Sequence, residues 1–126
     1  MSIALAHFAL GATLTTLAVT YLVPGVGYPR TLILAGGGWA MLPDAHQVAP
    51  VARETLYEVH RSSPLTDLFW FHRTLDAADP GDSTVVAAAL LACLIVATLL
   101  AERRSHEAPA AVVDAYEAHL GVEHEE

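Results

Sequence analysis

Histidine and aspartate side chains recur along this chain of 126 residues in patterns that could bind a divalent metal ion. The chain has seven histidines but a single cysteine, Cys93, so an internal disulfide and a metal cluster built on thiolates are both excluded. Imidazole nitrogens and carboxylate oxygens are ligands that zinc accepts, and a hydrolytic zinc site needs three or four of them with an open position for water. The chemistry that these residue types indicate is therefore metal-assisted hydrolysis.

Two short motifs in the first half of the chain supply candidate ligands. His7 lies early in an apolar segment, where an ionisable side chain indicates function, and Gly11 one turn later would let that face approach another helix. Asp44 and His46 follow Pro43, which should end or kink the preceding helix, and from an extended backbone both side chains can reach one point. The alternatives are a histidine that only wets the helix end at headgroup level and an aspartate that caps a simple turn.

A third motif lies further along the chain. His72, Asp76 and Asp79 are spaced i, i+4, i+7 and would share one face of a helix, where an imidazole and a carboxylate form a natural pair of zinc ligands. Arg73 could pair with Asp76 or bind an anion such as phosphate. The alternative is a polar, solvated helix end. His60 is a weaker candidate, because its surroundings look like an ordinary helix end.

The elements that must position these ligands are apolar helices. Residues 3–23 carry no formal charge and would reach about 30 Å as a helix, the thickness of the hydrocarbon core of a bilayer. Residues 84–101 form a second such segment, which Asp82 or Ser83 can cap. Both segments predict transmembrane helices. A Gly-rich block at residues 31–42 would span only about 18 Å, so it is either re-entrant or crosses together with residues after Pro43.

A polar helical connector, residues 44–83, joins these segments. It predicts one helix at about residues 51–61 and a second that starts with Ser63 as N-cap and Pro64 at its first position and runs to about Asp79. The fold class predicted is an all-α integral membrane protein, multi-pass in the cell membrane. Its predicted domains are a membrane domain over residues 1–104 and an acidic C-terminal tail over residues 105–126.

The charge balance bears on partners. The chain has fourteen Asp and Glu residues but only six Arg and no Lys, which gives a formal charge of −8. This charge argues against a nucleic-acid partner, and the predicted partner is the lipid bilayer. The acidic, lysine-free composition is typical of a salt-loving microbe such as a halophilic archaeon, since high salt screens self-repulsion. A transporter or channel is disfavoured, because three apolar segments cannot enclose a pathway unless the chain forms a homo-oligomer.

The order of the three motifs resembles the small membrane-bound, metal-dependent hydrolases of the YdjM type. Members begin with a helix carrying a histidine and then Leu-Gly, which corresponds to His7–Gly11. Their Gly-rich segment ends in Leu-Pro-Asp-x-Asp-His, which corresponds to Leu42–Gln47. A later motif reads His-Arg-Gly-x-Thr-His-Ser, and the corresponding residues here are His72–Ala77. His46 stands at the family's second aspartate, Gln47 at its following histidine, and Ala77, beside Asp76, at the second histidine of the later motif.

The resemblance implies metal-assisted hydrolysis by a divalent ion, zinc in the first instance. It implies as metal ligands His7, Asp44, His46 and His72. It further implies Asp76 as ligand or general base and Arg73 as the residue that steadies an anionic substrate, of the phosphate-ester or lipid-like class. A hypothesis from another class is a non-enzymatic helical membrane protein, an inactive family member whose histidines and aspartates join helices by hydrogen bonds.

Overall fold

The described part of the chain folds entirely into helices. The computed structural model describes residues 3–105, and within that range no residue lies in a strand. In chain order the elements are α1 (Ala4–Leu17), the π-helical turn η1 (Ala18–Leu22), α2 (Pro29–Met41), the 3-10 helix η2 (Leu42–Gln47), α3 (Arg53–Ser62), the 3-10 helix η3 (Pro64–Leu68), α4 (His72–Ala78) and α5 (Thr84–Ser105). The prediction of an all-α fold is confirmed. The predicted acidic tail begins at Ser105, which is the last residue of α5, and the rest of it, with His106, His119 and His124, lies outside the described residues.

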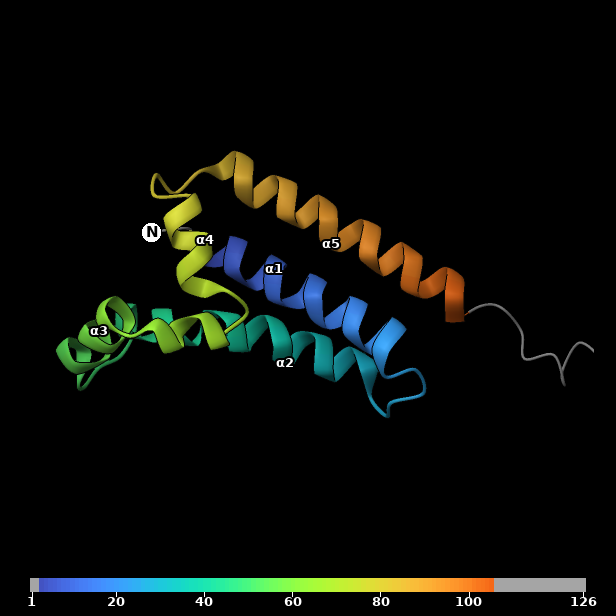
Figure 1. Ribbon diagram of the computed structural model, residues 1–126, viewed down its shortest axis with the longest axis horizontal. Helices are drawn as coiled ribbons and strands as arrows, with labels where there is room; N and C mark the ends of the chain where they lie inside the picture. The colour runs from blue at the N-terminus through green and yellow to red at the C-terminus, as the bar shows by residue number, and fades with distance from the viewer. Residues whose placement is uncertain (1–2, 106–126) are drawn as a thin grey trace, which may run out of the picture.

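Helix α1 is the centre of the arrangement, because α2 and α5 both pack along it, one on each side (Figure 1). The connector elements α3 and α4 gather at the end where α1 begins (Figure 1). Among the described residues the buried hydrophobic side chains are all alanines: Ala6, Ala9, Ala12, Ala40, Ala87 and Ala97. Small side chains let helix backbones approach closely, which is how apolar helices associate where lipid replaces water around them.

Glycines make the contact between α1 and α2 especially close. A Cβ atom added to Gly11 would lie 2.6 Å from the carbonyl oxygen of Gly36 and 2.6 Å from the Cβ atom of Ala40. One added to Gly37 would lie 2.5 Å from the ring of Phe8. Only glycine fits at such distances, so the close approach predicted for the face of α1 that carries Gly11 is confirmed. This approach brings the start of α1 against the end of α2.

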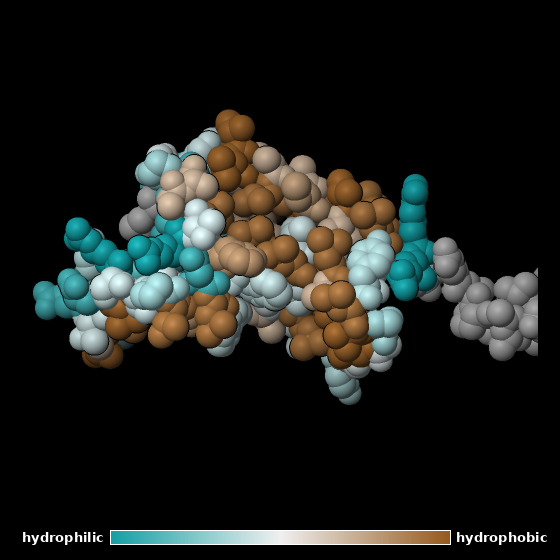
Figure 2. Space-filling model, viewed as in Figure 1, coloured by the Kyte–Doolittle hydropathy of each residue, from teal (hydrophilic) through white to brown (hydrophobic). Residues whose placement is uncertain are grey.

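Two helical segments in the described part of the chain are long and apolar enough to cross a membrane, Ala4–Leu22 and Thr84–Arg104. At 1.5 Å per residue they reach about 28 and 32 Å, close to the thickness of a hydrocarbon core. Helix α5 exposes large apolar side chains such as Ile95 and Leu99. Figure 2 shows apolar surface along the long helices and hydrophilic surface near α3 and at the end of α5. The membrane location itself stays a prediction.

The Gly-rich block forms α2, whose 13 residues span about 20 Å, less than a hydrocarbon core. Helical backbone continues beyond it into η2, and Pro43 lies in the first turn of this 3-10 helix. The α-helix ends at Met41, just before Pro43, as predicted, but the fixed φ of proline suits a first helical turn, so the backbone continues as a 3-10 helix. The expectation of an extended backbone from Asp44 to His46 is therefore wrong, although both side chains still turn inward.

The second helix predicted for the connector is divided in two. Ser63 accepts a hydrogen bond from the backbone N–H of Leu65, as predicted for an N-cap, but the element it starts is the short 3-10 helix η3. Trp70 and Phe71 then have positive φ angles of 53° and 60°, which break the helix and redirect the chain. Asp67 accepts the backbone N–H of Thr74 at 2.8 Å and so stabilises the start of α4.

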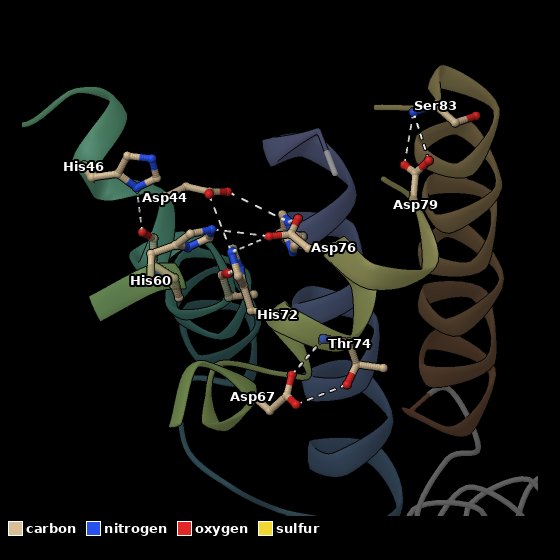
Figure 3. A network of polar contacts seen from close by, with 12 residues as sticks. Asp44, His46, His60, Asp67, His72, Thr74, Asp76, Asp79 and Ser83 are labelled. Carbon is tan, nitrogen blue, oxygen red and sulfur yellow. Dashed lines mark hydrogen bonds and ion pairs between the residues drawn. The ribbon is translucent and has the colours of Figure 1, made fainter. Parts of the chain in front are cut away.

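The end of α4 corrects a second expectation. Helix α4 ends at Ala78, and Asp79 leaves the helical backbone with φ −126°, so it does not share a face with His72 and Asp76. Its carboxylate instead accepts the backbone N–H of Ser83, with both oxygens 3.1 Å away (Figure 3). The Ser83 hydroxyl in turn lies 3.4 Å from the backbone N–H of Val86 and caps α5, as predicted.

Candidate metal centre

Six histidine and aspartate side chains from four elements meet at the end of the molecule where α1 begins (Figure 3). They are His7 from α1, Asp44 and His46 from η2, His60 from α3, and His72 and Asp76 from α4. The connector folds back over the start of α1, so the first and the last of these residues are in contact although 69 positions separate them in the chain. We call this group the His/Asp cluster.

Two stacked imidazoles form the buried part of the cluster. His7 is 1% exposed and His72 is fully buried, and their rings lie 3.8 Å apart between centroids, tilted by 17°. The close contact of α1 with α2 places His7, and the redirected chain before α4 places His72. A buried polar ring needs partners, so each of these positions requires groups nearby that accept or donate.

Asp44 faces both rings. One of its oxygens lies 3.9 Å from Nε2 of His7 and the other lies 3.5 Å from Nε2 of His72, and the residue is only 6% exposed. Neither oxygen accepts a hydrogen bond from any residue in the described range, and Nε2 of His72 likewise has no hydrogen-bond partner there. A buried carboxylate without hydrogen bonds is costly, and a cation is the natural group to satisfy it.

Asp76 lies near the same Nε2 atoms of His7 and His72. Its Oδ1 is 3.1 Å from Nε2 of His7, within hydrogen-bond distance. Its Oδ2 is 3.4 Å from Nε2 of His60 and 3.7 Å from Nε2 of His72. The second carboxylate therefore contacts three imidazoles that come from three different helices.

Backbone carbonyls set the tautomers of two of the histidines. Nδ1 of His72 lies 2.8 Å from the carbonyl oxygen of Ala40, and Nδ1 of His46 lies 3.1 Å from that of Pro43. A carbonyl can only accept, so both Nδ1 atoms carry the hydrogen. In the neutral form of each ring Nε2 then has the lone pair, and Nε2 of His72 points toward the carboxylates (Figure 3). Metal-binding histidines are held in this way, because the outer hydrogen bond fixes the ring and raises its basicity.

Two imidazoles of the cluster have pKa values shifted in opposite directions. Burial alone would lower the pKa of His72, but the carboxylate of Asp44, the carbonyl of Ala40 and the charge of Asp76 outweigh burial and raise it. Burial and the neighbouring His72 lower the pKa of His60 more than the two carboxylates raise it. His60 is therefore the readier of the two to be neutral, the form that binds metals.

Three overlapping sets within the cluster have ligand atoms that all lie within 4.8 Å of one another: His7, Asp44 and His72; Asp44, His46 and His60; and His60, His72 and Asp76. The cluster could therefore hold a metal ion. Its donors are imidazole nitrogens and carboxylate oxygens, which suit zinc and similar divalent ions. The oxygens of Asp44 and Nε2 of His72 fit this use because no described residue gives them a hydrogen bond.

A cleft adjoins the cluster at His46. It has a volume of about 350 Å³ and is lined by His46, Arg53, Glu54 and Tyr57. A larger cavity of about 510 Å³ lies toward the other end of α1, and its wall includes Thr16, Arg30 and Thr98 but no residue of the cluster. Only the smaller of these two cavities therefore offers a molecule a way to the candidate ligands.

The structure brings together all five side chains for which the sequence predicts metal binding: His7, Asp44, His46, His72 and Asp76. Binding itself stays a prediction. Sequence reasoning underrated His60, whose ring lies 5.0 Å from that of His46 and 5.1 Å from that of His72. It also passed over Arg53 in the cleft. Arg73 is exposed, on the solvent-facing side of α4 next to the buried His72.

Comparison with known proteins adds no identification, because no family model, curated protein or solved structure matches this chain.

Proposed function

We propose that this chain is a membrane-embedded, metal-dependent hydrolase that acts on phosphate-ester or lipid-like substrates. The observation that carries the proposal is Asp44, a buried carboxylate whose two oxygens face the imidazoles of His7 and His72 and accept no hydrogen bond from the described residues. A carboxylate is kept in such a place at a cost in stability, and a costly buried polar group without hydrogen bonds calls for a functional explanation.

The ligands would be His7, Asp44 and His72, each held by a different element, with the outer hydrogen bond from His72 to Ala40 keeping that ring in place. A bound divalent ion would lower the pKa of a water molecule and polarise the bond that the water attacks. Asp76 contacts three imidazoles but is 15% exposed, more than Asp44, so its carboxylate can also reach water and take a proton as a general base.

Two arginines could recognise an anionic substrate. Arg53 lines the cleft beside His46, where a phosphate group entering the cluster would pass it. Arg73 lies on α4 next to His72, with its side chain exposed. Guanidinium groups bind phosphate with two parallel hydrogen bonds, which suits the phosphate-ester class. The lipid-like class is supported by the two long apolar helices, which would hold the cluster beside the headgroups of a bilayer.

The test is hydrolysis of a phosphodiester dye substrate and of a short-chain phospholipid by the full chain in detergent, with and without added zinc. We expect activity that needs the ion and falls at least a hundredfold in Asp76→Asn, since a general base contributes about two to four powers of ten in rate. Asp67→Asn is a matched control, because Asp67 is a connector carboxylate that contacts Thr74 and lies outside the cluster. Equal rates in Asp76→Asn, Asp67→Asn and the original chain would contradict the proposal.

The non-enzymatic alternative is supported by the contact between His7 and Asp76, which joins α1 to α4 without any ion. It predicts that removing either side chain loosens the helices and lowers thermal stability, while zinc changes neither the melting temperature nor the rate of hydrolysis. A zinc-dependent melting temperature would argue against this alternative, because a ligand stabilises only the state that binds it.

A further inference from the structure

The six side chains of the His/Asp cluster are too widely spread to surround one ion. Ligands of a single zinc ion lie about 2.0–2.2 Å from it, so two of them are at most about 4.4 Å apart. Among the described residues His46 belongs to no set that contains His7, His72 or Asp76, even at a spacing of 4.8 Å. His46 and His7 therefore cannot be ligands of the same ion as they are placed.

Asp44 is a residue that two of the ligand sets share. It forms one set with His7 and His72 and another with His46 and His60. Its two oxygens are directed differently, one toward His7 and the other toward His72, and neither accepts a hydrogen bond from the described residues. Both oxygens thus face His7 and His72, and the second set places an oxygen of the same carboxylate within 4.8 Å of the ligand nitrogens of His46 and His60. Asp44 therefore reaches both pairs of imidazoles, as a bridging ligand would.

Asp76 also contacts imidazoles from both pairs. Its Oδ1 lies 3.1 Å from His7, and its Oδ2 lies 3.4 Å from His60. The two carboxylates thus stand between His7 on one side and His60 on the other. Their combined charge of −2 would be only neutralised by one divalent ion, whereas two ions would leave the cluster at +2 and ready for an anionic substrate.

We propose that the cluster holds two divalent cations, one on His7 and His72 and the other on His46 and His60, with Asp44 bridging them. This inference rests on the metal binding in the proposed function. Together with Arg53 in the cleft it narrows the proposed substrate to phosphate esters, because paired ions would stabilise the attacking and the leaving oxygen of a displacement at phosphorus and a guanidinium group binds phosphate. The cleft lined by His46 and Arg53 leads to the second ion.

The experiment is a titration of the metal-free full chain in detergent with Mn²⁺, followed by electron paramagnetic resonance and by the number of ions retained. We expect two ions per chain and a spectrum broadened by coupling between neighbouring ions. In the double variant His46→Gln, His60→Gln we expect one ion and the uncoupled six-line spectrum. Gln47→Ala is the matched control, because Gln47 is the exposed neighbour of His46 in the same 3-10 helix.

The outcomes separate this inference from the function on which it rests. One ion per chain in the original protein, kept by the double variant, would overturn the second site and leave the hydrolase proposal intact. Failure to bind any ion would overturn both. If circular dichroism shows that the double variant has lost its helices, the ion count and the spectrum of the original protein are the test. Two bound ions with an uncoupled spectrum would then overturn the bridging role of Asp44.

Discussion

Substituting Gly11 with alanine tests whether the contact between α1 and α2 places the metal ligands. The new Cβ atom would lie 2.6 Å from both the Gly36 carbonyl oxygen and the Ala40 Cβ atom, whereas ordinary contacts begin at 3.4 Å. The two helices must therefore part by about 0.8 Å. The obstacle is backbone and a methyl group, so no flexible side chain can move aside. Overpacking of this kind costs about 1–3 kcal/mol.

The same displacement reaches the cluster from two sides. His7 lies one turn from Gly11 on the same rigid helix, and Ala40, which the new methyl group would strike, holds the ring of His72 through its carbonyl oxygen. Metal sites tolerate shifts of about 0.2 Å in ligand distance. A loss of about 1.4 kcal/mol in binding free energy is tenfold in affinity, so we expect the zinc dissociation constant to rise by at least that factor.

The assay is competition for zinc against a chelator dye with the full chain in detergent. Gly38→Ala is the control, because a Cβ atom there meets nothing within 4 Å. That variant should keep the original zinc affinity and gain up to about 1 kcal/mol of helix stability, since alanine is the better helix former. If Gly11→Ala binds zinc as tightly as Gly38→Ala, the helix contact does not place the ligands, and the reasoning is refuted.

Three further expectations concern residues around the cluster. Asp79→Ala should lower the free energy of unfolding by about 0.5–2 kcal/mol in denaturant, because it removes the acceptor for the Ser83 N–H. We expect its metal content to be unchanged, and a loss of metal would show that Asp79 is a ligand. Arg73→Ala should leave the number of bound ions unchanged, because the side chain is exposed, and should raise the Michaelis constant for an anionic ester; reduced metal content would contradict this. Adding a chelator to the zinc-loaded protein should lower its melting temperature. If the free zinc concentration was a hundred times the dissociation constant, the free energy of unfolding should fall by about 2.7 kcal/mol. An unchanged melting temperature would count against metal binding.

The parts of the fold set by local pattern could be predicted from the sequence. The apolar segments at residues 3–23 and 84–101 correspond to the helical spans Ala4–Leu22 and Thr84–Arg104, because a long apolar run without proline, and with Gly11 as its one glycine, favours helix. The Ser63 cap could also be predicted, because its hydroxyl accepts a hydrogen bond from the backbone N–H only two residues later in the chain. Gly11 was informative because glycine on an apolar helix face has few purposes other than close packing.

The parts of the site that depend on where the chain turns and on contacts between distant residues could not be predicted from the sequence. The positive φ angles of Trp70 and Phe71 turn the chain before α4, and nothing in two aromatic residues signals a left-handed conformation. That turn directs His72 and Asp76 toward the cluster, whereas Asp79 lies beyond the end of α4 and is buried against the backbone of Ser83. His60 has no local sign of its role, because its nearest carboxylate partner is Asp76, 16 positions later in the chain. Tertiary packing therefore completed a cluster of which the sequence indicated five members.

The metal content of the purified full chain tests the central claim most directly. The protein would be loaded with zinc in detergent, freed of loosely bound ions by dialysis and measured by elemental analysis beside the double variant His72→Ala, Asp44→Ala. We predict two zinc ions per chain in the original protein and a loss of at least one in the variant, because each of the three ligand sets contains Asp44 or His72. No stoichiometric zinc in the original protein, or equal zinc in both, would contradict the claim that the His/Asp cluster is a metal centre.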